Sequence, residues 1–393
     1  MAESSSSTFA HGPELPAPVN LLEYLPQEWE ALLRSWGQPR FRALQVFRWI
    51  HQRAETDPEA MTDLPKALRQ RLQEEGLRPL LAVAADHLAG DGTRKLLVEM
   101  HDGRQVETVL IPRGSVAAED IYAPQELDDG EPSGAGQQAQ LTQCISSQVG
   151  CAMGCAFCAS GRAGLKRQMS AGEIVSQVLL ARRLMPSDVR HGGVVFMGMG
   201  EPLHNYGAVA RALCLLSHPE GLGMSLRRIT VSTSGLVPEM DRLAADFKGR
   251  VQLAVSIHAG DSATRSTIMP INRKYDLDQV VAAMRRYPLL ARKRLTIEYT
   301  LLSGVNDAVK DARQLAALLK GMRAKVNLIP MNSVSDSGFG APAAEAVDRF
   351  QAQLRAAGVD TFVRRRKGDD IAAACGQLAL HGEARKIRLP VRQ

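Results

Sequence analysis

Three cysteines spaced for metal binding are the strongest chemical signal in this 393-residue chain. They are Cys151, Cys155 and Cys158, and a single short loop can bring their thiolates to one centre. Soft sulfur ligands select iron–sulfur clusters, zinc or copper(I). Structural zinc sites and electron-transfer clusters normally take four ligands. Three local thiolates therefore predict a reactive metal centre that keeps one position open for another ligand.

Two further cysteines and one glutamate leave alternatives open when they are read alone. Cys144 precedes the loop, where it can complete a four-ligand site or act separately as a reactive thiol. Cys375 lies between small residues, which by themselves favour a buried and inert thiol. Glu107 falls inside an expected strand, where a lone glutamate usually faces solvent.

Polar residues follow several expected strands at the points where those strands end. Gly200 and Glu201 belong to the segment 198–202, in which glycines allow close backbone approach to a ligand and the carboxylate can bind an ammonium. Ser232 ends the next strand, and Ser256, Ile257 and His258 end the one after it. Hydroxyl and imidazole groups at such positions can bind a ribose, a carboxylate or an adenine, although each could also be a helix cap.

The elements that must position these residues alternate between strand and helix from residue 141 onward. Helical patterns of ten or more residues, such as 171–184, 277–286 and 308–319, separate the strands. Six such units predict a parallel sheet, and six are too few for a closed eight-stranded barrel. The expected strands are Leu141–Ser146, Val194–Met199, Arg228–Thr233, Val251–His258, Leu295–Leu302 and Lys325–Pro330.

The preceding residues divide into four smaller parts. Residues 1–18 are rich in Ser and Pro and are expected to be disordered. Residues 19–78 carry three helical stripes and predict a small helical domain. Residues 79–113 contain two Asp-Gly turns and predict a β-hairpin segment with strands at 95–100 and 105–111. Residues 114–140 hold six acidic and no basic residues, which predicts a loop insertion before the domain 141–393.

Composition narrows the class of protein. Hydrophobic residues make up 45% and charged residues 23%, which is typical of a packed globular chain. No apolar run is long enough for a membrane helix and no secretory signal is visible, so we expect a reducing, cytoplasmic location. Residues 361–393 carry eight Lys/Arg against three Asp/Glu. This basic block suits a phosphate backbone, and a solvated tail is the other reading.

The cysteine spacing behind the first strand of a βα array resembles the radical S-adenosylmethionine (SAM) superfamily. The wider block from Cys144 to Cys158 resembles one family within it, the adenine methyltransferases of large-subunit ribosomal RNA. Members of that family methylate C2 or, in a resistance branch, C8. The resemblance extends from about residue 20 to about residue 390. It implies an α/β fold with a partial (βα)6 radical-SAM barrel and a small N-terminal helical accessory domain that binds RNA.

The resemblance also implies the cofactors and their ligands. A [4Fe-4S] cluster would be held by Cys151, Cys155 and Cys158. The residues that would contact SAM are Gly200, Glu201, Ser232, Ser256, Ile257, His258 and Asn332. At Asn332 the chain reads Met-Asn-Ser where the family usually has Trp-Asn-Pro, which leaves the geometry of that loop open.

By the same resemblance, three residues would act on the methyl group and the base. Cys375 would receive a methyl group from one SAM molecule and carry it to the adenine. Glu107 would remove a proton from the adenine carbon. Cys144 would attack the Cys375 sulfur, which releases the product and leaves a disulfide to be reset by exchange.

The interpretation is C2 methylation of an adenine of 23S ribosomal RNA, in the peptidyl transferase centre. The segment 41–46 resembles the accessory domain and favours this branch over C8 methylation. The family includes members that also act on transfer RNA, and that second substrate stays open here. An electron donor such as a flavodoxin, a monomeric state and no membrane partner complete the expectation. The alternatives are a C8 methyltransferase, a radical-SAM enzyme with a non-RNA substrate and a non-catalytic, metal-containing RNA-binding protein.

Overall fold

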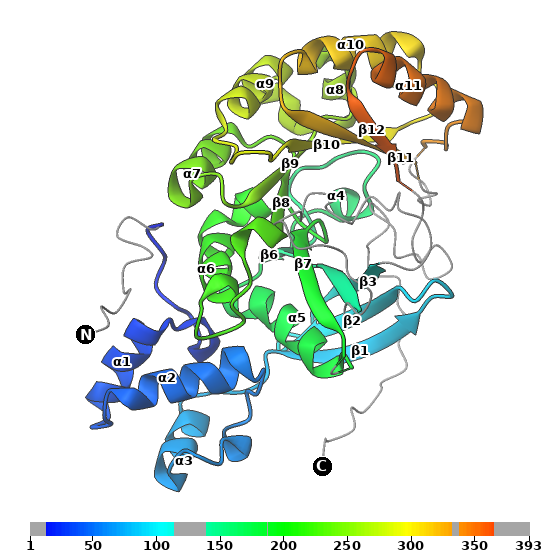
Figure 1. Ribbon diagram of the computed structural model, residues 1–393. Helices are drawn as coiled ribbons and strands as arrows, with labels where there is room; N and C mark the ends of the chain where they lie inside the picture. The colour runs from blue at the N-terminus through cyan, green and yellow to red at the C-terminus, as the bar shows by residue number, and fades with distance from the viewer. Residues whose placement is uncertain (1–12, 114–138, 187, 332–337, 365–393) are drawn as a thin grey trace.

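The computed structural model describes residues 13–113, 139–186, 188–331 and 338–364 of the chain. Figure 1 shows a group of short helices at the N-terminal end, long strands beside it, and a curved sheet with helices along its outer side. Residues 332–337 and 365–393 lie outside the described residues, so Asn332 and Cys375 have no structural description.

The N-terminal helical module packs through apolar stripes, as the helical spacing predicts. Its core includes Trp29 and Leu33 from the first long helix, both at most 1% exposed. Val46, Phe47 and Ile50 add a second, fully buried stripe, whereas Phe41 at the start of that stretch is 56% exposed. The helical elements are η1 (Leu21–Glu23), α1 (Pro26–Ser35), α2 (Phe41–Phe47), η2 (Arg48–Gln52), η3 (Pro58–Ala60) and α3 (Lys66–Glu74).

One ten-stranded sheet joins the hairpin segment to the barrel. The order of its strands is β1-β2-β3-β4-β7-β8-β9-β10-β11-β12. The β1–β2, β2–β3 and β3–β4 pairs are antiparallel, and the strands from β4 through β7 to β12 run parallel. The bounds are β1 (Leu81–Leu88), β2 (Arg94–Met100), β3 (Gln105–Arg113), β4 (Gln140–Cys144), β7 (Arg190–Phe196), β8 (Ile229–Thr233), β9 (Gln252–Ser256), β10 (Leu295–Leu301), β11 (Ala324–Pro330) and β12 (Asp360–Val363).

The expected partial (βα)6 barrel is confirmed, with two additions. The hairpin of residues 79–113 is the β2–β3 pair of a three-stranded extension that continues the barrel sheet through β4. A short seventh parallel strand, β12, closes the other edge. The helical elements of the barrel are α4 (Ala159–Ala163), α5 (Ala171–Leu184), η4 (Pro202–Asn205), α6 (Tyr206–Ser217), η5 (Leu226–Arg228), α7 (Val237–Phe247), α8 (Ser262–Ile268), η6 (Pro270–Arg273), α9 (Leu277–Arg286), α10 (Val309–Leu319) and α11 (Ala344–Ala356).

Buried polar contacts fix the helical module to the barrel. Arg211 of α6 is 2% exposed and donates hydrogen bonds to the backbone carbonyl of Glu23 and to the carboxylate of Glu28. The Glu23 side chain in turn accepts a hydrogen bond from the backbone N–H of Gly172 at the start of α5. A charged group that is buried and hydrogen-bonded in this way specifies one docking geometry.

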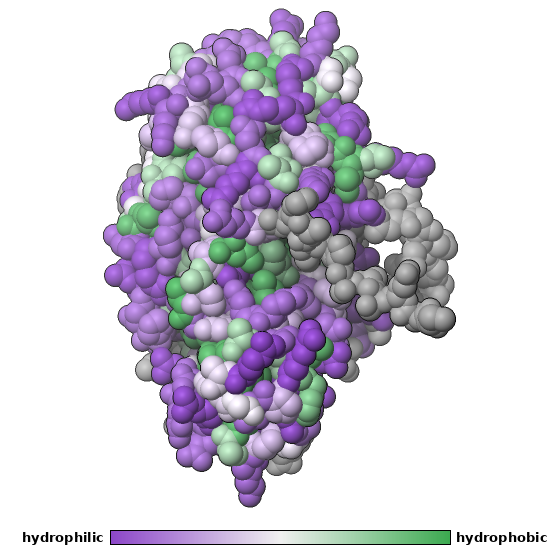
Figure 2. All heavy atoms as spheres, turned by 90° about the vertical axis from the view of Figure 1, so that its left-hand side faces the viewer, coloured by the Kyte–Doolittle hydropathy of each residue, from purple (hydrophilic) through white to green (hydrophobic). Residues whose placement is uncertain are grey.

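The surface shown in Figure 2 is mostly hydrophilic from the barrel helices down to the helical module. Its apolar areas are small and separate. Within the described residues, none of the helices combines the length and apolarity that a membrane crossing requires.

Candidate active site

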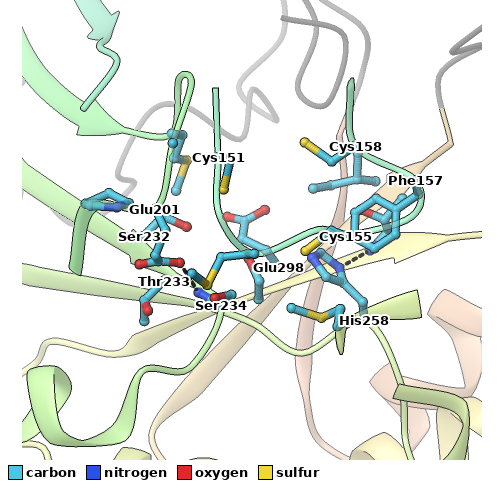
Figure 3. Close-up of a pocket in the computed structure, with 18 of the residues that line it drawn as sticks. Cys151, Cys155, Phe157, Cys158, Glu201, Ser232, Thr233, Ser234, His258 and Glu298 are labelled. Carbon is cyan, nitrogen blue, oxygen red and sulfur yellow. Dashed lines mark hydrogen bonds between the residues drawn. The ribbon is translucent and has the colours of Figure 1, made fainter. Parts of the chain in front are cut away.

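One cavity lies where the parallel strands end, and it contains about 930 Å³ of space not filled by atoms, part of which is open to solvent. It brings together most of the residues that the sequence singled out, from a loop and several strand ends. Figure 3 shows Glu201 and the 232–234 segment on one side, His258 and Cys158 on the other, and Glu298 between them. The predicted residues in its lining are Cys151, Cys155, Cys158, Gly200, Glu201, Ser232, Ser256 and His258.

The cysteine loop is closed at its base by a small two-stranded sheet. In this sheet β5 (Gln148–Val149) pairs with β6 (Arg167–Gln168), so the chain leaves and returns at one place. Gly150 has a φ of 75°, and a Cβ there would lie 1.9 Å from the carbonyl oxygen of Gly164. Only glycine fits this position, and its backbone conformation is one that other residues rarely adopt.

The thiols in the loop are in an environment that calls for a cation. Burial, together with the nearby charges of Glu201 and Cys158, raises the pKa of the Cys151 thiol to about 12. Burial also raises the pKa of Cys155, as do the neighbouring Cys158 and Cys151 thiols. A bound metal centre offsets such a cost, because a coordinating thiol is deprotonated by the charge of the metal.

The donor set fits a cluster rather than one ion. Among the residues that the structure describes, no three His, Cys, Asp or Glu side chains are close enough to hold a single metal ion. Three thiolates that hold an iron–sulfur cluster each bind a different iron, so they need no common ion. The chemistry of the set therefore suits a [4Fe-4S] cluster.

Glu201 is a buried carboxylate that keeps part of its binding capacity. Its two oxygens accept the backbone N–H groups of Ser234, at 2.7 Å, and of Leu203, at 3.1 Å. Burial raises the pKa of Glu201, and these hydrogen bonds oppose that shift. The carboxylate lines the cavity beside the cysteine loop, where its charge can bind a ligand ammonium.

Close backbone contact explains the two glycines before Glu201. A Cβ at Gly198 would lie 2.7 Å from the carbonyl oxygen of Ile145, and a Cβ at Gly200 would lie 2.5 Å from Cβ of Gln148. The Gln148 side chain also accepts the backbone N–H of Glu201 at 2.7 Å. The glycines thus let the 198–202 segment lie against the base of the cysteine loop and direct Glu201 into the cavity.

His258 is held as a neutral imidazole beside the loop. Its Nδ1 accepts the backbone N–H of Thr300 at 2.8 Å, and its ring packs edge-on against Phe157 with centroids 4.8 Å apart. Burial, together with the charge of Arg265, lowers the pKa of His258 to about 3. The remaining ring nitrogen therefore carries the hydrogen and can act as a donor.

Arg265 supports the cavity from below, although its sequence context gave no sign of this. It is fully buried in α8 and donates to the backbone carbonyls of Ile257, Ser234 and Ser256. Burial lowers its pKa to about 10. The guanidinium thus ties together the ends of β8 and β9, which carry the expected cofactor contacts.

Replacing Arg265 with methionine should destabilise the barrel. Three buried carbonyls would lose their donor, and we expect a loss of about 3–5 kcal/mol and a clear fall in melting temperature. Arg285→Met is the matched control, because exposed Arg285 also donates to two backbone carbonyls, those of Leu318 and Lys320. Equal melting temperatures for the two variants in thermal unfolding would contradict a supporting role for Arg265.

Glu107 and Cys144 lie together on the antiparallel side of the sheet. They are 5% and 3% exposed, on the adjacent strands β3 and β4. The hydroxyl of Thr108 donates to the carbonyl of Cys144 at 2.8 Å, and that of Ser146 donates to the carbonyl of Glu107 at 2.7 Å. The Ser146 hydroxyl also accepts the N–H of Met199, which connects this pair to the 198–202 segment.

Sequence reasoning missed Glu298 as a cavity residue. Its carboxylate is buried in β10, accepts a hydrogen bond from Asn327 at 2.9 Å and lies 3.6 Å from the guanidinium of Arg364. Burial raises the pKa of Glu298 to about 7, against the opposing effect of the Asn327 hydrogen bond. The signal available in the sequence was a carboxylate in the middle of an apolar strand, which the structure buries along its whole length.

Ile257 is placed differently from the other expected contacts. It is 1% exposed and its side chain packs in the main core. Its backbone N–H donates to the carbonyl of Glu298, and its carbonyl accepts from Arg265. Ile257 therefore helps to orient the neighbouring Ser256 and His258, while its own side chain packs in the core and not in the cavity.

Comparisons with known proteins match both parts of the chain. A family model for the ribosomal RNA large subunit methyltransferase N-terminal domain matches residues 19–76, and the radical SAM superfamily model matches residues 145–316. The chain is 54% identical over 381 residues to the dual-specificity RNA methyltransferase RlmN of Sorangium cellulosum (strain So ce56), covering 94% of this chain and 98% of that protein. It is 46% identical to the RlmN of Anaeromyxobacter dehalogenans (strain 2CP-C), with 92% of each chain covered.

A solved structure gives the same result for the fold. The crystal structure of a radical SAM methyltransferase from Sphaerobacter thermophilus superimposes with a TM-score of 0.81 at 42% sequence identity. The match covers 92% of this chain and 99% of that one.

Proposed function

The chain belongs to the RlmN family of radical SAM RNA methyltransferases, and from that membership we propose that it methylates C2 of an adenine in 23S ribosomal RNA and in transfer RNA. The two relatives named above are dual-specificity RNA methyltransferases. The chain matches them over 98% and 92% of their length. The observation that carries the proposal is the shared cavity of the three loop cysteines, Glu201 and His258.

The cofactor residues have separate tasks in this proposal. Cys151, Cys155 and Cys158 would hold a [4Fe-4S] cluster, which would supply one-electron radical chemistry to this cavity when bound. Glu201 binds the ammonium of SAM through the charge of its carboxylate, which lines the cavity. Ser232, Ser256 and neutral His258 offer hydrogen bonds along the strand ends, Gly200 gives room for close approach, and Asn332 is proposed from the resemblance alone.

The reacting residues act on the methyl group and the base. Cys375 carries the methyl group to the adenine carbon, an atom that is not nucleophilic and resists ordinary methyl transfer. Glu107 accepts the proton from that carbon. The Cys144 thiolate attacks the Cys375 sulfur, and the carbon–sulfur electron pair passes to the product carbon, which takes up a proton to complete the methyl group. A disulfide remains for later exchange.

The remaining parts of the proposal concern partners. Module 19–78 and the basic segment at the C-terminal end would position folded RNA, because a target base must be exposed before its carbon can be reached. A flavodoxin-type electron donor, a monomeric enzyme and a cytoplasmic location accompany this function.

Anaerobic reconstitution tests the proposal. The full chain is loaded with iron and sulfide, reduced, and given SAM with unmodified 23S ribosomal RNA fragments or transfer RNA. The expected result is 5′-deoxyadenosine release and 2-methyladenine in both RNAs by mass spectrometry. Methylation at C8, 5′-deoxyadenosine release without RNA methylation, or a colourless zinc-loaded protein would each contradict it.

A further inference from the structure

A buried ion pair joins β2 to β3 at the proposed base. Nζ of Lys95 lies 3.1 Å from Oε1 of Glu107, and the two side chains are 12% and 6% exposed. We propose that Lys95 is a positioning residue that keeps the Glu107 carboxylate ionised and oriented for removal of the adenine proton. This inference rests on the proposed function, in which Glu107 is the base.

The strand register places the cation beside both residues that finish the reaction. Lys95 is the partner of Val109 in the β2–β3 pair, and Val109 is the partner of Cys144 in the β3–β4 pair. Directly opposed residues share a face of a sheet, as do residues two apart on one strand. Lys95, Glu107 and Cys144 therefore lie on the same face.

A buried carboxylate needs such a partner to act as a base. Burial disfavours the charged form of a carboxylate, and a carboxyl that already holds a proton cannot accept another. A cation in contact favours the charged form. When the carbon–hydrogen bond of the adenine breaks, the ring keeps the electron pair and the proton passes to Glu107, so the ion pair becomes a neutral carboxyl beside an ammonium.

The rest of the Glu107 environment supports a specific role for Lys95. The backbone of Glu107 is fixed by the Ser146 hydroxyl, which leaves the direction of the side chain to its own contacts. Among the described residues, the titratable groups that face Glu107 from the adjacent strands are Lys95 and Glu99 of β2 and Cys144 of β4. Glu99 accepts a hydrogen bond from Gln105 and is another carboxylate, so Lys95 is the group in this set whose charge favours an ionised Glu107.

The test follows the covalent RNA–protein adduct that waits for proton removal. Reconstituted full-length Lys95→Met, Lys95→Arg and Glu107→Gln enzymes are given SAM and an unmodified ribosomal RNA fragment from pH 6 to pH 9. Arg94→Met is the matched control, because Arg94 is the adjacent residue on β2 and forms an ion pair with Asp86 instead, at 2.8 Å. The readouts are 5′-deoxyadenosine, adduct on a denaturing gel, and methylated adenine.

We expect Lys95→Met to form 5′-deoxyadenosine at close to the parental rate and to accumulate adduct at low pH. Without the cation, the carboxyl of Glu107 should hold its proton to higher pH. Adduct resolution should then slow about tenfold for each pH unit below the pKa of that carboxyl, and it should recover toward pH 9. Lys95→Arg keeps the parental profile, and Arg94→Met resolves its adduct normally.

Two results would overturn the inference. One is parental adduct resolution by Lys95→Met at every pH. The other is an equal, pH-independent slowing in Lys95→Met and Lys95→Arg, which a purely structural role predicts. If Lys95→Met does not fold, Lys95→Gln is judged by the same pH profile. Failure of the proposed function is distinguishable, because Glu107→Gln itself would then resolve its adduct normally.

Discussion

Replacing Cys155 with alanine is expected to remove the iron–sulfur cluster and to abolish RNA methylation. Cys155 lies in the middle of the loop and lines the cavity with Cys151 and Cys158, so its loss leaves two thiolates for a centre that needs three. Without radical chemistry the rate should fall to the uncatalysed level, a loss of more than about 10⁶-fold. Iron content, visible absorbance and 5′-deoxyadenosine release measure the effect.

Cys214→Ala is the matched control for this variant. Cys214 is also a buried thiol, whose pKa burial raises to about 12, but it packs in α6 within the main core. Its replacement should cost about 1 kcal/mol of stability and leave the iron content unchanged. A Cys155→Ala enzyme that retains full iron and still cleaves SAM would contradict the assignment of the cluster ligands.

Much of the barrel could be predicted from local signals. The sequence predicts helices over 171–184 and 277–286, and α5 and α9 have these bounds. Each begins with a capping box, formed by Ser170 with Glu173 and by Asp276 with Gln279. Such signals are local, because the cap and its partner are three residues apart. The strands that end in the proposed cofactor contacts were predictable for a similar reason, since each is a short apolar run.

The features that the sequence did not reveal depend on distant contacts. The seventh strand β12 has four residues and is defined by its pairing with β11, so no periodic pattern marks it. Arg265 and Glu298 belong to residue types that usually face solvent, and only the packed barrel turns them inward. The exposed Phe41 is the reverse case, an aromatic residue in a helical stripe that the module leaves outside its core.

Replacing Cys144 with alanine is expected to stop turnover after RNA has become covalently attached to the enzyme. In the proposed reaction, attack by the Cys144 thiolate breaks the bond between the Cys375 sulfur and the product carbon. Alanine removes the thiol while the backbone of β4 keeps its pairing with Val109, so earlier steps should proceed. Denaturing gels and mass spectrometry should show RNA linked to Cys375 and less than one methylated adenine per enzyme.

Cys375→Ala is expected to give the opposite result. Without the thiol that carries the methyl group no RNA becomes attached, although SAM and the cluster can still bind. Cys144→Ser should behave as Cys144→Ala does, because a hydroxyl is far less ionised than a thiol near neutral pH and the thiolate is the attacking species. Normal turnover by Cys144→Ala would show that release of the product uses another group. Adduct formation by Cys375→Ala would show that another residue carries the methyl group.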